Sequence, residues 1–248
     1  MKSKVVTLPS QVLGRPARFC LYLPPQPPRG LLYLLHGHGG RCTDWPGRTN
    51  IEALAAARGL AVVMPDLADG YCMDMARGLP WFSYITGELP GLAARLCGRS
   101  FDPAHTWAAG LSAGGYGALR WAMTAPRTMA ACASLSGVTD LAARIALLPP
   151  ARLDEFRPLC GDGLTVAPQN DLPALTRAAA CRGVPVFLAC GQQDEFFPMN
   201  REYASLLAAC GFHCTWRMAP GGHNWDYWSR WLAPAVDWML AAAPPPED

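Results

Sequence analysis

The fold is indicated by residues 106–124, which read TWAAGLSAGGYGALRWAMT. Residues 106–109 are a short apolar run typical of a buried strand, and residues 113–124 have the pattern of a helix. Between them lies G-x-S-x-G, residues 110–114. A strand that turns so sharply into a helix strains the backbone at the serine and leaves its hydroxyl above the sheet edge. We therefore predict that Ser112 is a nucleophile; the alternative is a glycine-rich turn that packs a helix closely on a strand.

The rest of the chain alternates short apolar runs with longer amphipathic segments. This rhythm is typical of the α/β class, a mostly parallel sheet covered by helices on both faces. We expect strands over residues 5–8, 17–23, 30–35, 60–64, 106–109, 130–135, 184–190 and 213–218. We expect helices over residues 50–58, 89–97, 113–124, 199–210 and 225–240. The sequence thus predicts a single domain, residues 1–248.

One segment, residues 140–183, breaks the rhythm before the penultimate strand. Its periodicity is weak, it contains Pro149-Pro150 and the turn Gly161-Asp162-Gly163, and it suggests a helix only near residues 172–181. A connection of this length is often a small lid or substrate-binding segment. The other interpretation, a helical crossover that covers the sheet, stays open.

Composition limits the class of protein. The 248 residues are 51% hydrophobic and 16% charged, so the chain can bury a large core and global disorder is excluded. The 21 basic and 19 acidic residues leave a net charge of +2, which argues against a nucleic-acid partner. Apolar stretches fall short of the ~18 residues of a membrane span, and no export signal follows Met1. We expect a cytoplasmic protein without a membrane partner.

The ten cysteines are irregularly spaced and form no C-x-x-C pair. We therefore predict mostly buried thiols in a reducing compartment. His36 with His38, and His213 with Cys214, hint at metal ligands, but neither has a second ligand pair at zinc spacing. No metal site is expected.

A serine hydroxyl needs a base to take its proton. Downstream of Ser112 the sequence offers His213, inside an expected strand, and His223, in the loop Pro220-Gly221-Gly222-His223 before the last helix. A loop at that place can bring an imidazole to the serine. We therefore predict His223 to be the base.

The base in turn needs an acid to orient it. Asp194 follows the apolar run of residues 184–190, in the loop at the carboxyl end of the penultimate strand. We predict that Asp194 is this acid. Glu195 is the alternative, whereas Asp226 is interpreted as a charge at a helix N-terminus.

An acyl oxyanion needs backbone N–H donors from two places. One is expected to be Ala113, the residue after the serine. The other is expected in the loop HGHGG, residues 36–40, with His38 as first choice and Gly39 as second. The imidazole of His36 is expected to brace this loop by hydrogen bonds.

Together these stretches resemble the putative-esterase branch of the α/β-hydrolases, which includes esterase D, tributyrin esterases and mycolyltransferases. They are most similar to the small bacterial tributyrin esterases. Ala113 departs from the Met that these families more often have, and the motif around Asp194 is looser. The resemblance runs in order through residues 31–40, 45, 62–66, 71–75, 84–90, 110–118, 134–137, 189–194 and 222–228.

The resemblance implies an α/β-hydrolase fold and a cofactor-free serine carboxylesterase. Ser112, Asp194 and His223 would form its triad. The implied substrates are short-chain acyl esters, acetyl and butyryl esters among them, and in some relatives acetylated or feruloylated sugars. Five residues lie near segments that line the substrate pocket in relatives: Tyr71, Asp74, Trp81, Phe82 and Tyr116. Each could contact the substrate or could instead pack in the core.

Two other functions stay open. An S-formylglutathione hydrolase-like thioesterase would use the same chemistry, but it needs basic groups for the glutathione carboxylates, and no basic cluster lies near the catalytic loops. A non-catalytic hydrolase fold could act as a binding module, although the intact set of Ser112, Asp194 and His223 argues against it. The sequence does not fix the oligomeric state, and a homo-oligomer stays open.

Overall fold

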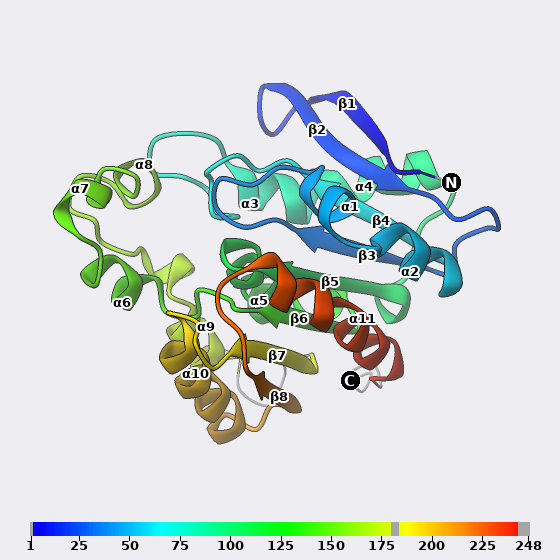
Figure 1. Ribbon diagram of the computed structural model, residues 1–248. Coiled ribbons are helices and arrows are strands. Elements are labelled where there is room, and N and C mark those ends of the chain that lie inside the picture. The colour runs from blue at the N-terminus through cyan, green and yellow to red at the C-terminus, as the bar shows by residue number, and fades with distance from the viewer. Residues whose placement is uncertain (1, 180–183, 243–248) are drawn as a thin grey trace.

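A computed structural model describes residues 2–179 and 184–242 of the chain (Figure 1). Its strands form one eight-stranded sheet in the order β1-β2-β4-β3-β5-β6-β7-β8. Strands β3 to β8 run parallel, and β2 is antiparallel to both of its neighbours. The strands are β1 (Lys4–Ser10), β2 (Arg15–Tyr22), β3 (Gly30–Leu35), β4 (Leu60–Pro65), β5 (Thr106–Leu111), β6 (Ala131–Leu135), β7 (Val186–Gly191) and β8 (Cys214–Ala219).

Helices cover both faces of this sheet, as the apolar strands predict. Helices α1 (Asp44–Arg48), α2 (Ile51–Ala57) and α11 (Trp225–Ala241) lie on one face. The other face is covered by α4 (Leu89–Cys97), α5 (Ala113–Thr124), α9 (Leu172–Ala178) and α10 (Phe197–Ala209). No helix in the described part of the chain is long and apolar enough to span a membrane.

Strand β3 shows how the two cores are separated. Leu31, Tyr33 and Leu35 point into the core beneath α4 and α5. Leu32 and Leu34 point into the core beneath α2 and α11. Because side chains alternate along a strand, an uninterrupted apolar run fills both cores at once.

The expected strands and helices are present, with shifted ends. Strand β5 continues to Leu111 because Gly110 and Leu111 still pair with β6. Helix α10 begins earlier, at Phe197, with a proline in its first turn. The helix expected over residues 172–181 is α9, and its expected last residues lie outside the described part of the chain.

The short elements α1, α3 (Trp81–Ser83) and the π-helical turn η1 (Tyr84–Glu88) were not predicted. The 3₁₀ turns η2 (Pro103–His105), η3 (Pro126–Thr128) and η4 (Pro168–Asn170) were missed as well. Segments of three to five residues are shorter than the window in which a helical period can be recognised.

The insertion has two parts that match the two interpretations. Helix α9 packs against α5 and so covers the sheet. Helices α6 (Leu141–Ala146), α7 (Pro150–Leu153) and α8 (Arg157–Cys160) instead project beyond the sheet, at the left of Figure 1. Asp140 caps the start of α6, since its carboxylate accepts a hydrogen bond from the Ala143 N–H at 2.8 Å.

Candidate active site

The turn from β5 into α5 places Ser112 in the left-handed region, with φ +53° and ψ −119°. Serine rarely adopts this backbone conformation, so the surrounding structure must enforce it. A Cβ on Gly110 would lie 2.3 Å from the Gly114 carbonyl, and a Cβ on Gly114 would lie 2.4 Å from the carbonyl oxygen of Leu35. The two glycines are therefore required by the sharpness of the turn.

The structure brings together the three side chains predicted to act on a substrate. His223 Nε2 lies 3.0 Å from Ser112 Oγ, and His223 Nδ1 lies 3.0 and 3.1 Å from the two carboxylate oxygens of Asp194. These contacts fit the tautomer whose Nδ1–H donates to the carboxylate and whose Nε2 accepts from the hydroxyl. All three residues follow parallel strands, so they meet at the carboxyl edge of the sheet.

Asp194 is buried and stays ionised. Burial by itself raises the pKa of its carboxyl group. The hydrogen bond from His223, the positive charge of that imidazole when it is protonated, and the Phe196 N–H at 2.8 Å together lower this pKa below its ordinary value. Glu195, the alternative acid, turns away to pair with Arg144 at 3.0 Å and is 56% exposed. Asp226 lies in the first turn of α11, as predicted.

The loops that carry Asp194 and His223 are fastened to each other. The Gln193 N–H donates to the Gly221 carbonyl at 3.0 Å, and the Gly221 N–H donates to the Gln193 side-chain oxygen at 2.7 Å. Asn224, directly after His223, caps α11 by accepting from the Tyr227 N–H at 3.1 Å. The residues on both sides of His223 in the sequence are thus fixed by hydrogen bonds, which positions its imidazole.

The loop after β3 runs beside the serine: a Cβ on Gly37 would lie 3.3 Å from Ser112 Cβ. His36 braces this loop as expected, since Nδ1 donates to the Gly37 carbonyl at 2.6 Å and Nε2 accepts from the Leu67 N–H at 2.9 Å. Desolvation by burial lowers the pKa of His36 and favours this neutral form.

The structure distinguishes the two oxyanion amides considered in this loop. The Gly39 N–H already donates to the Asp69 carboxylate at 3.1 Å, which favours His38 as the donor. Ala113 is the first residue of α5, where backbone N–H groups lack partners within the helix. The loop that carries His38 and the N-terminus of α5 both lie next to Ser112.

Of the five residues expected near the pocket, Tyr71 lies beside the catalytic loops, with its ring 5.2 Å from that of His38. The other four make contacts with neighbouring parts of the protein. Asp74 accepts hydrogen bonds from Ser83, Trp81 packs on Gly70, Phe82 lies 3.6 Å under the Arg120 guanidinium, and Tyr116 donates to the Asn170 carbonyl at 2.8 Å.

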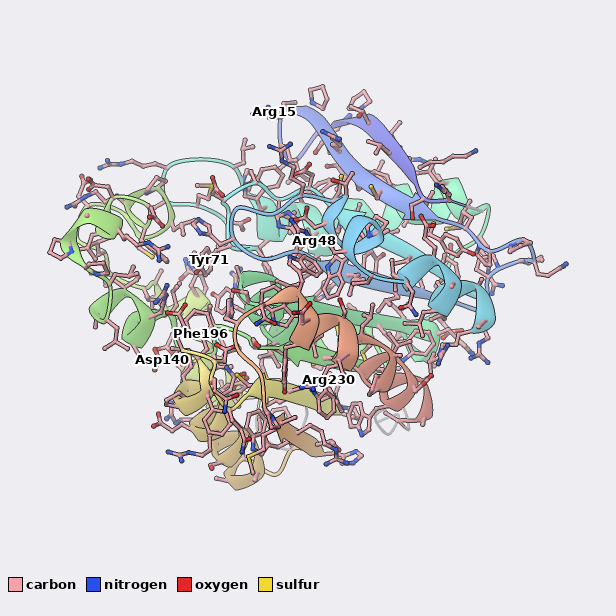
Figure 2. All side chains as sticks on the ribbon, in the orientation of Figure 1. Arg15, Arg48, Tyr71, Asp140, Phe196 and Arg230 are labelled. Carbon is pink, nitrogen blue, oxygen red and sulfur yellow. The ribbon has the colours of Figure 1, made fainter. Side chains whose placement is uncertain are left out.

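Sequence reasoning missed four residues around the site: Arg144, Phe156, Phe196 and Trp228. Phe196 and Trp228 contact His223 edge-on, with ring centroids 4.7 and 4.9 Å away. Arg144 stacks 4.9 Å above Phe196, and Figure 2 shows Phe196 and Tyr71 on the side of the sheet that faces α6–α8. Trp228 belongs to the G-H-x-W-x-x-W stretch, whereas nothing in the sequence pattern singles out Phe156.

Two of the histidines considered as metal ligands, His36 and His213, make other contacts. Both ring nitrogens of His36 are hydrogen-bonded, and His213 is exposed, 5.7 Å from the Trp238 ring. Over residues 2–179 and 184–242, no group of three or more His, Cys, Asp or Glu side chains could hold a metal ion.

Similarity to known proteins identifies the family. Residues 10–239 match the model of the family described as Putative esterase. The chain is 30% identical over 223 residues to an acetyl esterase of Caldicellulosiruptor saccharolyticus, covering 84% of this chain and 82% of the relative. It is 26% identical over 261 residues to an S-formylglutathione hydrolase of Paracoccus denitrificans (strain Pd 1222), covering 92% and 89%.

Among solved structures, the fluorophosphonate-binding serine hydrolase F of Staphylococcus aureus superposes with a TM-score of 0.86 at 23% identity, covering 97% of this chain and 99% of that one. The fold is therefore that of the α/β-hydrolases, as the resemblance implied. Within that class, the chain belongs to the family described as Putative esterase and is a carboxylic ester hydrolase.

Proposed function

We propose that this chain is a serine esterase that hydrolyses short-chain acyl esters through an acyl-enzyme on Ser112. The observation that carries the proposal is the unbroken contact from Ser112 through His223 to the buried Asp194. The 30% identity to a protein described as an acetyl esterase supports the acetyl group as substrate. Acetyl and butyryl esters of small alcohols, acetylated sugars included, are the substrate class.

In the first half of the reaction, Ser112 Oγ attacks the ester carbonyl carbon while His223 Nε2 takes its proton. The Asp194 carboxylate holds the imidazole and stabilises its positive charge. The N–H groups of His38 and Ala113 stabilise the negative charge that develops on the carbonyl oxygen. The C–O bond then breaks, and the alcohol leaves with the proton from His223.

In the second half, His223 takes a proton from water, and the resulting hydroxide attacks the acyl carbon. The tetrahedral intermediate collapses, Ser112 Oγ recovers its proton from His223, and the carboxylic acid leaves. Each step uses the same imidazole alternately as base and acid, so the reaction needs no group beyond the protein and water.

A thioesterase acting on S-formylglutathione is the second candidate, because a 26%-identical relative carries that description. Such a substrate presents carboxylates that need cationic partners. The arginines of α6–α8 already have carboxylate partners: Arg144 pairs with Glu195, Arg152 with Glu155, and Arg157 with Asp154. This pairing favours a neutral oxygen ester.

The test is a set of initial rates on p-nitrophenyl acetate, butyrate and octanoate and on S-formylglutathione, with Ser112→Ala alongside. We expect kcat/KM to fall with acyl length, and Ser112→Ala to lose roughly 10⁴–10⁶-fold in rate. Ser205→Ala, which removes an exposed hydroxyl on α10, is the matched control and should leave the rate unchanged.

Equal and feeble ester rates in wild type and Ser112→Ala would contradict the proposal and favour a non-catalytic binding module. A kcat/KM for S-formylglutathione far above that for every oxygen ester would favour the thioesterase. The two outcomes are distinct, because the thioesterase would still depend on Ser112.

A further inference from the structure

Two groups of aromatic side chains flank Ser112. The first, which we term the histidine-side group, consists of Phe196 and Trp228 against His223. The second, the loop-side pair, consists of Tyr71 and Phe156 against His38. Within the pair the ring centroids are 5.4 Å apart, and they lie 5.2 and 6.2 Å from the ring of His38.

The reaction assigns a different part of the ester to each group. The departing alcohol must take its proton from His223 Nε2, so the alcohol leaves beside the histidine-side group. The carbonyl oxygen is bound by the amides of His38 and Ala113. The remaining substituent of the carbonyl carbon, the acyl chain, is then directed away from His223, toward the loop-side pair.

The insertion holds Phe156 firmly in this place. Phe156 lies between α7 and α8, yet it is only 1% exposed because Tyr71, His38 and the neighbouring core cover it. The loop that follows Tyr71 pairs with the insertion just beyond Phe156: Ala76 N–H donates to the Leu159 carbonyl at 3.2 Å, and Arg77 N–H to the Pro158 carbonyl at 2.9 Å. These hydrogen bonds fix the backbone of the insertion just beyond Phe156.

The position of Tyr71 is as closely fixed as that of Phe156. Its backbone is in the left-handed region, with φ +51°, which is costly for a bulky residue and requires support from its surroundings. Burial raises the pKa of its hydroxyl to about 12, an effect that the nearby charge of Arg144, the arginine that stacks on Phe196, partly offsets. His38 is therefore flanked by two buried rings, while Ser112 itself is only 7% exposed.

We propose that Phe156, packed against Tyr71, is the residue that limits the acyl group to short chains. On this proposal, an acetyl group ends near the oxyanion amides and avoids the Phe156 ring, whereas an octanoyl or feruloyl group extends as far as that ring. This inference rests on the proposed function and identifies a specificity-determining residue of the same site. It also predicts that acetylated sugars are better substrates than feruloylated ones.

The experiment compares wild type, Phe156→Ala, Phe156→Leu and the control Leu147→Ala, whose side chain lies in the same insertion but is 74% exposed. The acyl group is varied at constant alcohol with p-nitrophenyl acetate, butyrate, octanoate and ferulate. The alcohol is varied at constant acyl group with phenyl, 1-naphthyl and 4-methylumbelliferyl acetate. Melting curves establish that each variant is folded.

In Phe156→Ala we expect the octanoate-to-acetate ratio of kcat/KM to rise by about 10–100-fold, within the range that pocket size typically commands. Phe156→Leu should give a smaller rise in the same direction, which keeps the test decisive if the alanine variant does not fold. The alcohol series should keep its wild-type ratios, and Leu147→Ala should match wild type in both series.

An unchanged acyl-length profile in a folded Phe156 variant would overturn the inference, as would a changed alcohol series with an unchanged acyl series. Either result would leave the proposed esterase function intact, because Ser112-dependent hydrolysis of p-nitrophenyl acetate by the wild type tests that function separately. Absence of that hydrolysis would contradict both the proposed esterase function and the proposed role of Phe156.

Discussion

The active site is built from two regions that follow different rules. The loops at the carboxyl edge of the sheet are fixed by close backbone contacts, such as those that require glycine at 110 and 114. The insertion that carries α6–α8 consists of helices of four to six residues, joined to the rest by side-chain packing, by backbone hydrogen bonds to residues 76 and 77, and by the ion pair of Arg144 with Glu195. The comparison suggests that the sheet edge fixes the chemistry and the insertion fixes the choice of substrate.

The largest effect is expected from a substitution at the sheet edge that changes the chemistry of a side chain and keeps its shape. Asp194→Asn should lower kcat by about 10⁴-fold, because an amide can present its N–H to His223 and stabilise the wrong tautomer. The neighbouring Glu195→Gln is the control and should keep the rate within about 3-fold, because an exposed ion pair contributes little. Steady-state rates on p-nitrophenyl acetate measure both, and equal losses in the two variants would contradict the assignment of the acid.

A smaller effect is expected on stability, again at the sheet edge. Gly114→Ala should lower the free energy of unfolding by about 3 kcal/mol, the upper part of the usual range for overpacking, since the new methyl group would meet the backbone of Leu35 and His36. Gly163→Ala, in the insertion, should change it by less than about 1 kcal/mol, because the nearest atom beyond its chain neighbours is 3.5 Å from the added Cβ.

Urea unfolding midpoints at equal protein concentration measure this difference. Similar losses in the two glycine variants would show that the insertion is as tightly built as the elbow. A stable and active Gly114→Ala would show that the turn at Ser112 is less constrained than the contacts indicate.

The smallest expected effect is a pH dependence of stability that originates in His36. Its pKa is lower in the folded than in the unfolded chain, so the folded state resists protonation. The stabilising contribution is fully present above the unfolded pKa of about 6.5 and is lost as the pH falls below it, by at most ~1.4 kcal/mol per pH unit.

Urea titrations of wild type and His36→Asn at pH 7.5 and 5.5 test this expectation. The variant should be less stable at pH 7.5 and should lose less stability on acidification than the wild type. An identical loss in the two proteins would mean that His36 is not the group that resists protonation.

Much of the sheet edge could be predicted from sequence, for physical reasons. The alternation of apolar runs and amphipathic segments fixes strands and helices, and parallel strands bring their carboxyl ends together. Ser112, Asp194 and His223 were therefore singled out from their places after strands, and the structure brings them into contact. The sequence already ranked His38 ahead of Gly39 as an oxyanion donor, and the structure adds a physical reason, because the Gly39 N–H donates to the carboxylate of Asp69, 30 positions away.

The insertion could not be predicted in the same way. Helices α7 and α8 have four residues each, too few to show a period. Phe156 occupies its place beside Tyr71 through contacts between segments about 80 residues apart, such as that between Arg77 and Pro158. Tyr71 contacts His38 of the catalytic loops, whereas a substrate role for Asp74, Trp81, Phe82 and Tyr116 stays a prediction. In a chain that is 51% hydrophobic, an aromatic residue near a catalytic loop most often fills the core.

The central claim is that Ser112 is a nucleophile activated by His223. A fluorophosphonate probe followed by peptide mapping tests it most directly, with and without prior acylation by p-nitrophenyl acetate. The account predicts covalent labelling at Ser112, slowed by the acetate ester and abolished in Ser112→Ala and His223→Ala. Labelling at another residue, or equal labelling of wild type and Ser112→Ala, would contradict it.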